Sequence, residues 1–132
     1  MKALGRHLLV EYGGCDRETL DDIERIEVLL RRAAEEAGAT VVAAVFHPFS
    51  PQGITGVVVV EESHLSIHTW PEHGYAAVDF YTCGDCHPER AHEFLERELG
   101  ATQSEVMVVE RGREPPGASM DVRSHDLGAT RN

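Results

Sequence analysis

The sequence predicts an α+β fold, a two-layer sandwich in which a largely antiparallel sheet carries two helices on one face. Short β-branched runs are separated by tight turn signals, which favours antiparallel pairing of successive strands. Two longer segments have apolar residues at spacings of three and four, which is typical of helices that cover a sheet. In this chain of 132 residues, residues 1–113 should form a single domain, and the proline- and glycine-containing residues 114–132 a mobile tail.

The first half of the chain should form a strand, a helix and two more strands. The first strand begins with the apolar residues 8–10 and ends at a pair of glycines. Asp16 can cap the following helix, which has acidic residues in its first turns and arginines in its last turns, and which stops at Gly38. Residues 41–46 and 54–60 are β-branched runs on either side of a turn with proline and glycine, so they predict two neighbouring strands.

The second half should add two strands, a helix and a last strand. Residues 65–68 and 76–81 alternate between apolar and polar side chains, as half-buried strands do. Pro88 suits the first turn of a second helix, and residues 106–109 form the last strand. The predicted order is therefore βαββββαβ. Because both helices cover the same face, the other face needs a cover, which suggests that two copies pack sheet on sheet in a dimer.

The composition narrows the classes of function. A net charge of −11, from 23 acidic and 12 basic side chains, argues against nucleic acid or an anionic membrane as a partner. No signal peptide or membrane-spanning run is visible, so a cytoplasmic location and three free cysteine thiols are expected. Lys2 is the only lysine, which argues against a pyridoxal phosphate enzyme. An enzyme of this composition that handles amines would need a carbonyl group from another source.

The bond between Glu62 and Ser63 is a candidate site of self-cleavage. A serine hydroxyl can attack the preceding carbonyl and turn the amide into an ester, and elimination across that ester leaves a ketone at the new amino terminus. The dipeptide alone is more typical of the polar end of a strand. If the bond is cleaved, the ketone is a catalytic electrophile.

Several motifs accompany this dipeptide, and together they resemble one family. They are Glu62-Ser63-His64, His68-Thr69-Trp70-Pro71-Glu72, Tyr81-Thr82-Cys83-Gly84, the amino-terminal Met1-Lys2-Ala3-Leu4-Gly5-Arg6-His7, and the segment from Phe46-His47 to Gly56. From residue 1 to about residue 113, the chain resembles the prokaryotic S-adenosylmethionine decarboxylase proenzyme, a pyruvoyl enzyme of polyamine synthesis.

The resemblance implies a self-cleaved enzyme. Cleavage would give a β chain, residues 1–62, and an α chain, residues 63–132, with a covalent pyruvoyl cofactor in place of Ser63. The enzyme would decarboxylate S-adenosylmethionine for spermidine synthesis, as a homodimer of αβ pairs. No metal is expected.

The resemblance also assigns the residues of processing. His68 would remove the Cα proton of Ser63, which a neutral imidazole can do near pH 7. Thr55 stands where the family usually has a serine whose hydroxyl binds the intermediate, and the extra methyl group could slow processing. In a regular strand Ser63 and His68 point to opposite faces, so a turn or bulge between Glu61 and His64 is needed to bring them together.

The residues of turnover are assigned in the same way. Cys83 matches the family's proton donor, and a cysteine thiol is largely protonated at neutral pH, so it has a proton to give. Phe49 resembles the aromatic residue that stacks on adenine, and Glu72 the carboxylate that holds the ribose hydroxyls. Trp70 lines the same pocket or is an ordinary core or surface residue. The resemblance places this pocket at the dimer interface.

Other interpretations remain open at this point. A pyruvoyl decarboxylase of the same fold could act on arginine or ornithine, and a relative that is never cleaved could only bind partners. The run from Cys83 to His87 matches the Cys-x-x-Cys-His pattern of haem attachment, and Cys-x-x-Cys also occurs in redox proteins. A zinc site formed by Cys83, Cys86, His87 and His92 lacks a second recognisable ligand pair.

Overall fold

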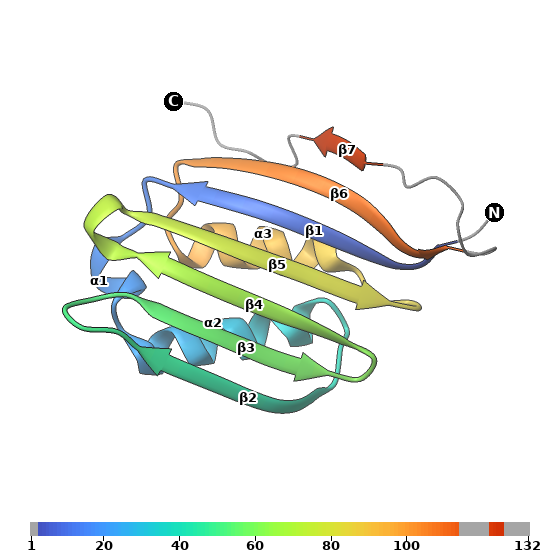
Figure 1. The fold of residues 1–132 in the computed structure, drawn as a ribbon, viewed down its shortest axis with the longest axis horizontal. Helices are drawn as coiled ribbons and strands as arrows, with labels where there is room; N and C mark the ends of the chain where they lie inside the picture. Colours follow the sequence, from blue (N-terminus) through green and yellow to red (C-terminus); the bar gives the residue numbers. More distant parts are fainter. Residues whose placement is uncertain (1–2, 114–121, 126–132) are drawn as a thin grey trace.

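The computed structural model describes residues 3–113 and 122–125, and its architecture is the predicted α+β sandwich of two layers (Figure 1). The elements along the chain are β1 (Ala3–Gly13), α1 (Arg17–Leu20), α2 (Ile23–Glu36), β2 (Val41–Pro48), β3 (Ile54–Val60), β4 (Ser63–Trp70), the 3-10 helix η1 (Pro71–His73), β5 (Tyr75–Cys83), α3 (Pro88–Glu98), β6 (Gln103–Arg113) and β7 (Val122–His125).

The strands form one sheet in the order β2-β3-β4-β5-β1-β6-β7, and every neighbouring pair is antiparallel. Helices α2 and α3 lie side by side across the same face of this sheet (Figure 1). The prediction of an antiparallel sheet with two helices on one face is therefore confirmed. Within the described residues, no helix is both long and apolar enough to cross a membrane.

The helical segment after the first strand differs from the prediction of one helix. It is divided into the short α1 and the longer α2, because two aspartates each begin a helix. The side chain of Asp16 accepts a hydrogen bond from the backbone N–H of Thr19, and that of Asp22 accepts one from the N–H of Arg25, both at 3.1 Å. Each bond satisfies a backbone donor that has no partner within its own helix.

The carboxyl-terminal segment that was predicted to be a mobile tail contains an additional strand. Residues 122–125 form β7, which pairs with β6. The rest of that segment, residues 114–121 and 126–132, lies outside the described residues.

The core lies between the sheet and the helices, because side chains along each strand alternate between the two faces of the sheet. In β5, for example, every second residue from Ala76 to Thr82 is buried. Each fully buried leucine, isoleucine or phenylalanine in this layer stabilises the fold by about 1.5–3 kcal/mol. The largest of them include Leu8, Leu29, Leu30, Ile54, Leu65, Ile67, Phe80 and Leu95.

We call the other side of the sheet the open face, since none of the described helices covers it. Polar side chains point to it from five neighbouring strands: His7, Thr55, His64, Ser66, His68, Asp79, Tyr81, Cys83 and Arg111. Apolar side chains are also exposed there, namely Val45 (66 %), Val59 (40 %), Trp70 (40 %) and Met107 (41 %). Exposed apolar side chains on a face without helices mark a surface that another layer can cover.

Candidate active site

The bond predicted to be cleaved lies at the tight turn between β3 and β4. Val60 and Ser63 are paired across this hairpin, so Glu61 and Glu62 form a two-residue loop. Glu62 has a φ of 69° and is the only residue other than glycine with a positive φ in the described part of the chain. Because a side chain in this left-handed region costs about 1 kcal/mol, the residue before the candidate bond is held in a strained conformation.

The Ser63 hydroxyl is buried directly after this strained residue. Ser63 shares the helix-facing side of β4 with Leu65 and Ile67. Its Oγ atom is shielded from solvent and has no hydrogen-bond partner among the described residues. A buried hydroxyl without a partner is unfavourable in a purely structural role, and it is therefore a candidate for chemistry.

Cys83 reaches the candidate bond from the last position of β5. Its Sγ atom donates a hydrogen bond to the backbone carbonyl of Glu62 at a distance of 3.4 Å. This carbonyl is the group that a Ser63 hydroxyl would attack. The structure thus brings together Glu62, Ser63 and Cys83 at one end of the sheet, which we call the cleavage end.

The strain at Glu62 should be measurable as a change in the free energy of unfolding. In an uncleaved Ser63→Ala background, Glu62→Gly should raise the free energy of unfolding by about 1 kcal/mol, because glycine has no Cβ atom to oppose a positive φ. Urea unfolding followed by circular dichroism measures this difference. Glu61→Gly is the matched control. It should not raise the free energy of unfolding, since Glu61 is not in the left-handed region. Equal losses of stability in both variants would contradict the assignment of strain.

The predicted substrate-binding residues lie at the opposite end of β3 and β4, around a hollow of about 280 Å³. We call this site the hollow. The structure brings together there all three predicted binding residues and both remaining processing residues. The full lining is Phe49, Gln52, Gly53, Ile54, Thr55, His68, Thr69, Trp70 and Glu72.

Hydrogen bonds between side chains and backbone groups tie the floor of the hollow to the helical layer. The buried hydroxyl of Thr69 accepts a hydrogen bond from the N–H of Ile54 at 3.0 Å and donates one to the carbonyl of Leu20 at 2.8 Å. The N–H of Gly53 donates to the carboxylate of Asp21 at 3.0 Å. The loop that carries Phe49 is therefore anchored at its end, beside the hollow that Phe49 helps to line.

Thr55 and His68 are directly opposite each other on β3 and β4. The Oγ1 atom of Thr55 lies 3.0 Å from Nδ1 of His68, within hydrogen-bonding distance. This contact orients the exposed imidazole and occupies Nδ1, which leaves Nε2 as the other ring nitrogen for a substrate or a proton.

The structure does not bring Ser63 and His68 together within one chain. The pairing of β4 with both neighbouring strands is regular from Ser63 onward, without a bulge. The turn at Glu62 therefore leaves Ser63 on the helix-facing side and His68 on the open face, five positions and roughly 17 Å apart along the strand. The bulge that the sequence required is not present in this part of the chain, so the cleavage end and the hollow are separate half-sites.

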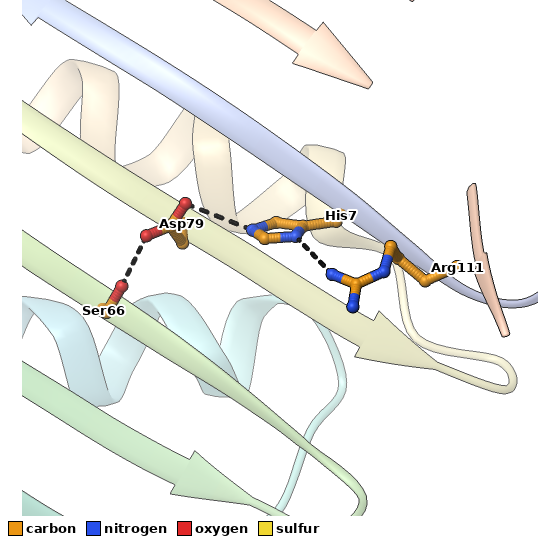
Figure 2. A network of polar contacts seen from close by, with 4 residues as sticks. All are labelled: His7, Ser66, Asp79 and Arg111. Atoms are coloured by element: carbon orange, nitrogen blue, oxygen red, sulfur yellow. Dashed lines mark hydrogen bonds and ion pairs between the residues drawn. The ribbon is translucent and has the colours of Figure 1, made fainter. Parts of the chain in front are cut away.

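A polar network on the open face was missed from the sequence (Figure 2). Nε2 of His7 lies 3.1 Å from one carboxylate oxygen of Asp79, and the Ser66 hydroxyl donates to the other at 2.8 Å. An Arg111 nitrogen lies 3.3 Å from Nδ1 of His7. The hydrogen bond from His7, followed by that from Ser66, holds the pKa of Asp79 below its usual range, so the carboxylate stays ionised.

His64 lies between this network and the cleavage end, directly opposite Tyr81 on β5. Burial, and then the neighbouring His7, lower the pKa of His64. His64 is therefore neutral at physiological pH, next to the serine of the candidate bond.

The Cys-x-x-Cys segment forms the turn between β5 and α3. Burial, and then Cys83 and Asp85, raise the pKa of Cys86, which is opposite to the lowered pKa of reactive redox pairs. All three cysteines of the chain are free thiols. Within the described residues, no group of three or more His, Cys, Asp or Glu side chains is arranged to hold a metal ion. His92, one of the residues considered for zinc, is buried against Tyr12 in the core.

Comparison with known proteins places this geometry in a family. The sequence model described as S-adenosylmethionine decarboxylase matches residues 6–112. The S-adenosylmethionine decarboxylase proenzyme of Thermotoga maritima is 54 % identical over 114 residues, covering 86 % of this chain and 88 % of that protein. The proenzyme of Moorella thermoacetica is 51 % identical over 121 residues, covering 90 % and 97 %.

A solved structure agrees with the sequence comparisons. The crystal structure of the adenosylmethionine decarboxylase from Aquifex aeolicus VF5 superposes with a TM-score of 0.80 at 38 % identity, covering 90 % of this chain and 99 % of that one. The family model spans most of the chain, and the relatives match it over nearly their whole length. The chain therefore belongs to the S-adenosylmethionine decarboxylase family.

Proposed function

We propose that this chain cleaves itself between Glu62 and Ser63 and then decarboxylates S-adenosylmethionine, a step of spermidine synthesis, in the cytoplasm. The observation that carries the proposal is the cleavage end. There, a strained residue precedes a buried hydroxyl without a partner, and a thiol donates to the carbonyl between them. Attack on that carbonyl places negative charge on an oxygen that Cys83 already contacts, so Cys83 assists cleavage as well as turnover.

Cleavage proceeds in steps that this site can support. Ser63 Oγ bonds to the Glu62 carbonyl carbon while the C–N bond breaks and the Ser63 nitrogen takes up a proton, which gives an ester. A base then removes the Ser63 Cα proton, a double bond forms between Cα and Cβ, and the Cβ–Oγ bond breaks, so that Glu62 leaves as a carboxylate that keeps the former serine oxygen. Water finally replaces the nitrogen, which departs as ammonia. Residues 1–62 and 63–132 are the products, and the second begins with a pyruvoyl group.

The surroundings of Ser63 fit a pyruvoyl group. Because Ser63 Oγ has no hydrogen-bond partner among the described residues, its loss on cleavage would break no hydrogen bond. When formed, the group supplies a carbonyl that binds the substrate amine and accepts electrons as carbon dioxide leaves. Cys83 then delivers a proton to the substrate carbon. Its contact with the Glu62 carbonyl, next to the proposed pyruvoyl position, supports this role.

A second copy of the chain completes the site in this proposal. His68 and Thr55 lie at the hollow, roughly 17 Å along the strand from Ser63, so one chain cannot bring its own base to its own serine. A twofold axis that stacks two open faces with their strands reversed places the hollow of one copy against the cleavage end of the other. The exposed side chains of Val45, Val59 and Met107 are then buried between the two sheets.

The hollow fits a cationic nucleoside substrate. Phe49 and Trp70 offer aromatic faces, on which a planar base can stack and which attract a positive sulfonium centre. Glu72 offers a carboxylate for hydroxyl groups, and the net charge of −11 attracts a cation at long range. A free amino acid such as arginine or ornithine has no aromatic base to stack on these rings and no ribose hydroxyls for Glu72 to hold.

Two measurements on the purified protein test the function. Mass spectrometry under reducing conditions should find two fragments, of which the second is lighter by one ammonia than a fragment that begins with serine. Carbon dioxide should be released from S-adenosylmethionine and not from arginine or ornithine. Release from an amino acid alone would support the other pyruvoyl decarboxylases, whereas an intact and inactive chain would support a protein that only binds partners.

A further inference from the structure

Tyr81 stands at the centre of a group of side chains on the open face, next to the cleavage end. Its ring centroid lies 5.5 Å from that of His7 and 5.7 Å from that of His64. The guanidinium carbon of Arg111 lies 5.5 Å from the same ring centroid, in a cation–π contact. Side chains from β1, β4 and β6 thus hold a ring that belongs to β5.

The network of Figure 2 fixes the residues that hold this ring. His7 is hydrogen-bonded to the ionised carboxylate of Asp79 on one side and contacts Arg111 on the other. These contacts restrict rotation of both the His7 ring and the Arg111 guanidinium. The Tyr81 side chain is confined in turn. No part of the proposed reaction uses these residues directly, yet they all converge on a tyrosine two positions from Cys83.

Tyr81 and Cys83 meet over Gly5, which faces them from β1. A methyl group added at Gly5 would lie 2.8 Å from Cε1 of Tyr81 and 3.0 Å from Sγ of Cys83, so the ring edge and the sulfur atom share the space that a glycine leaves. Burial, and then hydrogen bonding with the neighbouring Cys83, raise the pKa of Tyr81. The Tyr81 hydroxyl therefore stays protonated, on a ring whose edge borders the same space as the Cys83 sulfur.

We propose that Tyr81 is a positioning residue for Cys83, holding the thiol against the Glu62 carbonyl before cleavage and stabilising the thiolate during turnover. The inference rests on the proposed function and deepens it. When the Cys83 S–H bond breaks and its proton forms the new C–H bond of the substrate, the sulfur keeps the electron pair. The Tyr81 hydroxyl donates to that sulfur without losing its own proton, and solvent restores the thiol after product release.

Tyr81→Phe tests the proposal because it removes only the hydroxyl and keeps the ring that the histidines and Arg111 contact. We expect kcat for S-adenosylmethionine to fall about tenfold, the effect of losing one hydrogen bond to a charged group, with KM nearly unchanged. Tyr75→Phe is the matched control. It lies on the same strand and the same face, its hydroxyl donates to Glu11, and its loss should leave kcat unchanged.

A second readout separates a role through the thiol from a general loss of structure. The rate of iodoacetamide alkylation at Cys83, read by peptide mass against pH, should shift to higher pH in Tyr81→Phe, while Cys86 in the same spectra should not shift. In a Cys83→Ala background, Tyr81→Phe should have no further effect on the residual turnover.

The outcomes distinguish this inference from the proposed function. An uncleaved and inactive wild-type chain would remove the proposed function itself. If the wild type is cleaved and active but Tyr81→Phe matches Tyr75→Phe in both kcat and alkylation profile, the role of Tyr81 is wrong. An equal loss of turnover with and without the Cys83 thiol would also overturn it, because the effect would not pass through the sulfur.

Discussion

Ser63→Ala should yield a single uncleaved chain of 132 residues whose decarboxylase activity is lower than that of the wild type by about a thousandfold or more. The expected loss is this large because the same atom, Ser63 Oγ, begins cleavage and determines where the catalytic ketone forms. Intact mass and carbon dioxide release measure the two losses in the same sample.

The fold itself should tolerate Ser63→Ala. Since Ser63 Oγ has no hydrogen-bond partner among the described residues, its removal should change the free energy of unfolding by less than about 0.5 kcal/mol. The control is Ser104→Ala, which removes another buried hydroxyl, one that donates to Glu96 at 2.7 Å. That variant should be less stable yet fully cleaved. A Ser63→Ala chain that is cleaved, or that turns over normally, would exclude the pyruvoyl proposal.

Mixing two inactive variants should restore about a quarter of the wild-type activity if the site is shared between copies. Ser63→Ala retains His68, and His68→Ala retains Ser63. In a mixed dimer, the Ser63 of one chain meets the His68 of the other at one of the two sites. The second site lacks both residues. Random pairing makes half of the dimers mixed, and half of their sites complete.

The experiment requires that both chains be produced together, because cleavage must occur after the mixed dimer has formed. Mass spectrometry should then find fragments only from the His68→Ala chain, which carries the intact serine. Each variant produced alone is the control and should stay uncleaved. Absence of cleavage in the mixture, with mixed dimers shown to be present, would contradict a site that two copies share.

The strands and their faces could be predicted from the sequence because side chains on a strand alternate with a period of two. The β-branched run 54–60 predicted a strand with the bounds that the structure has, and the alternation set Ser63 and His68 on opposite faces. The division of the first helix was not predicted, because the apolar spacing continues across Asp21 and Asp22. Only the side-chain cap at Asp22 shows that a second helix begins there.

The two half-sites could be predicted residue by residue, but their separation and the network beside them could not. His7, Asp79 and Arg111 come from three strands that are distant in the sequence, and they meet because β1 inserts between β5 and β6. No local pattern specifies this strand order. The left-handed conformation of Glu62 was equally hidden, because glutamate is not a residue that signals a positive φ.

The insertion of β1 between β5 and β6 has a consequence for the proposed cleavage. A cut after Glu62 would leave β1, β2 and β3 on one polypeptide and the remaining described strands on the other. Three of the six strand junctions would then join different polypeptides, and α2 would pack on α3 across the same division. The two polypeptides would be interleaved and would hold together without a covalent link. Once unfolded and separated, they would have to find each other again by diffusion, so refolding of the cleaved protein should depend on its concentration, whereas refolding of the uncleaved chain should not.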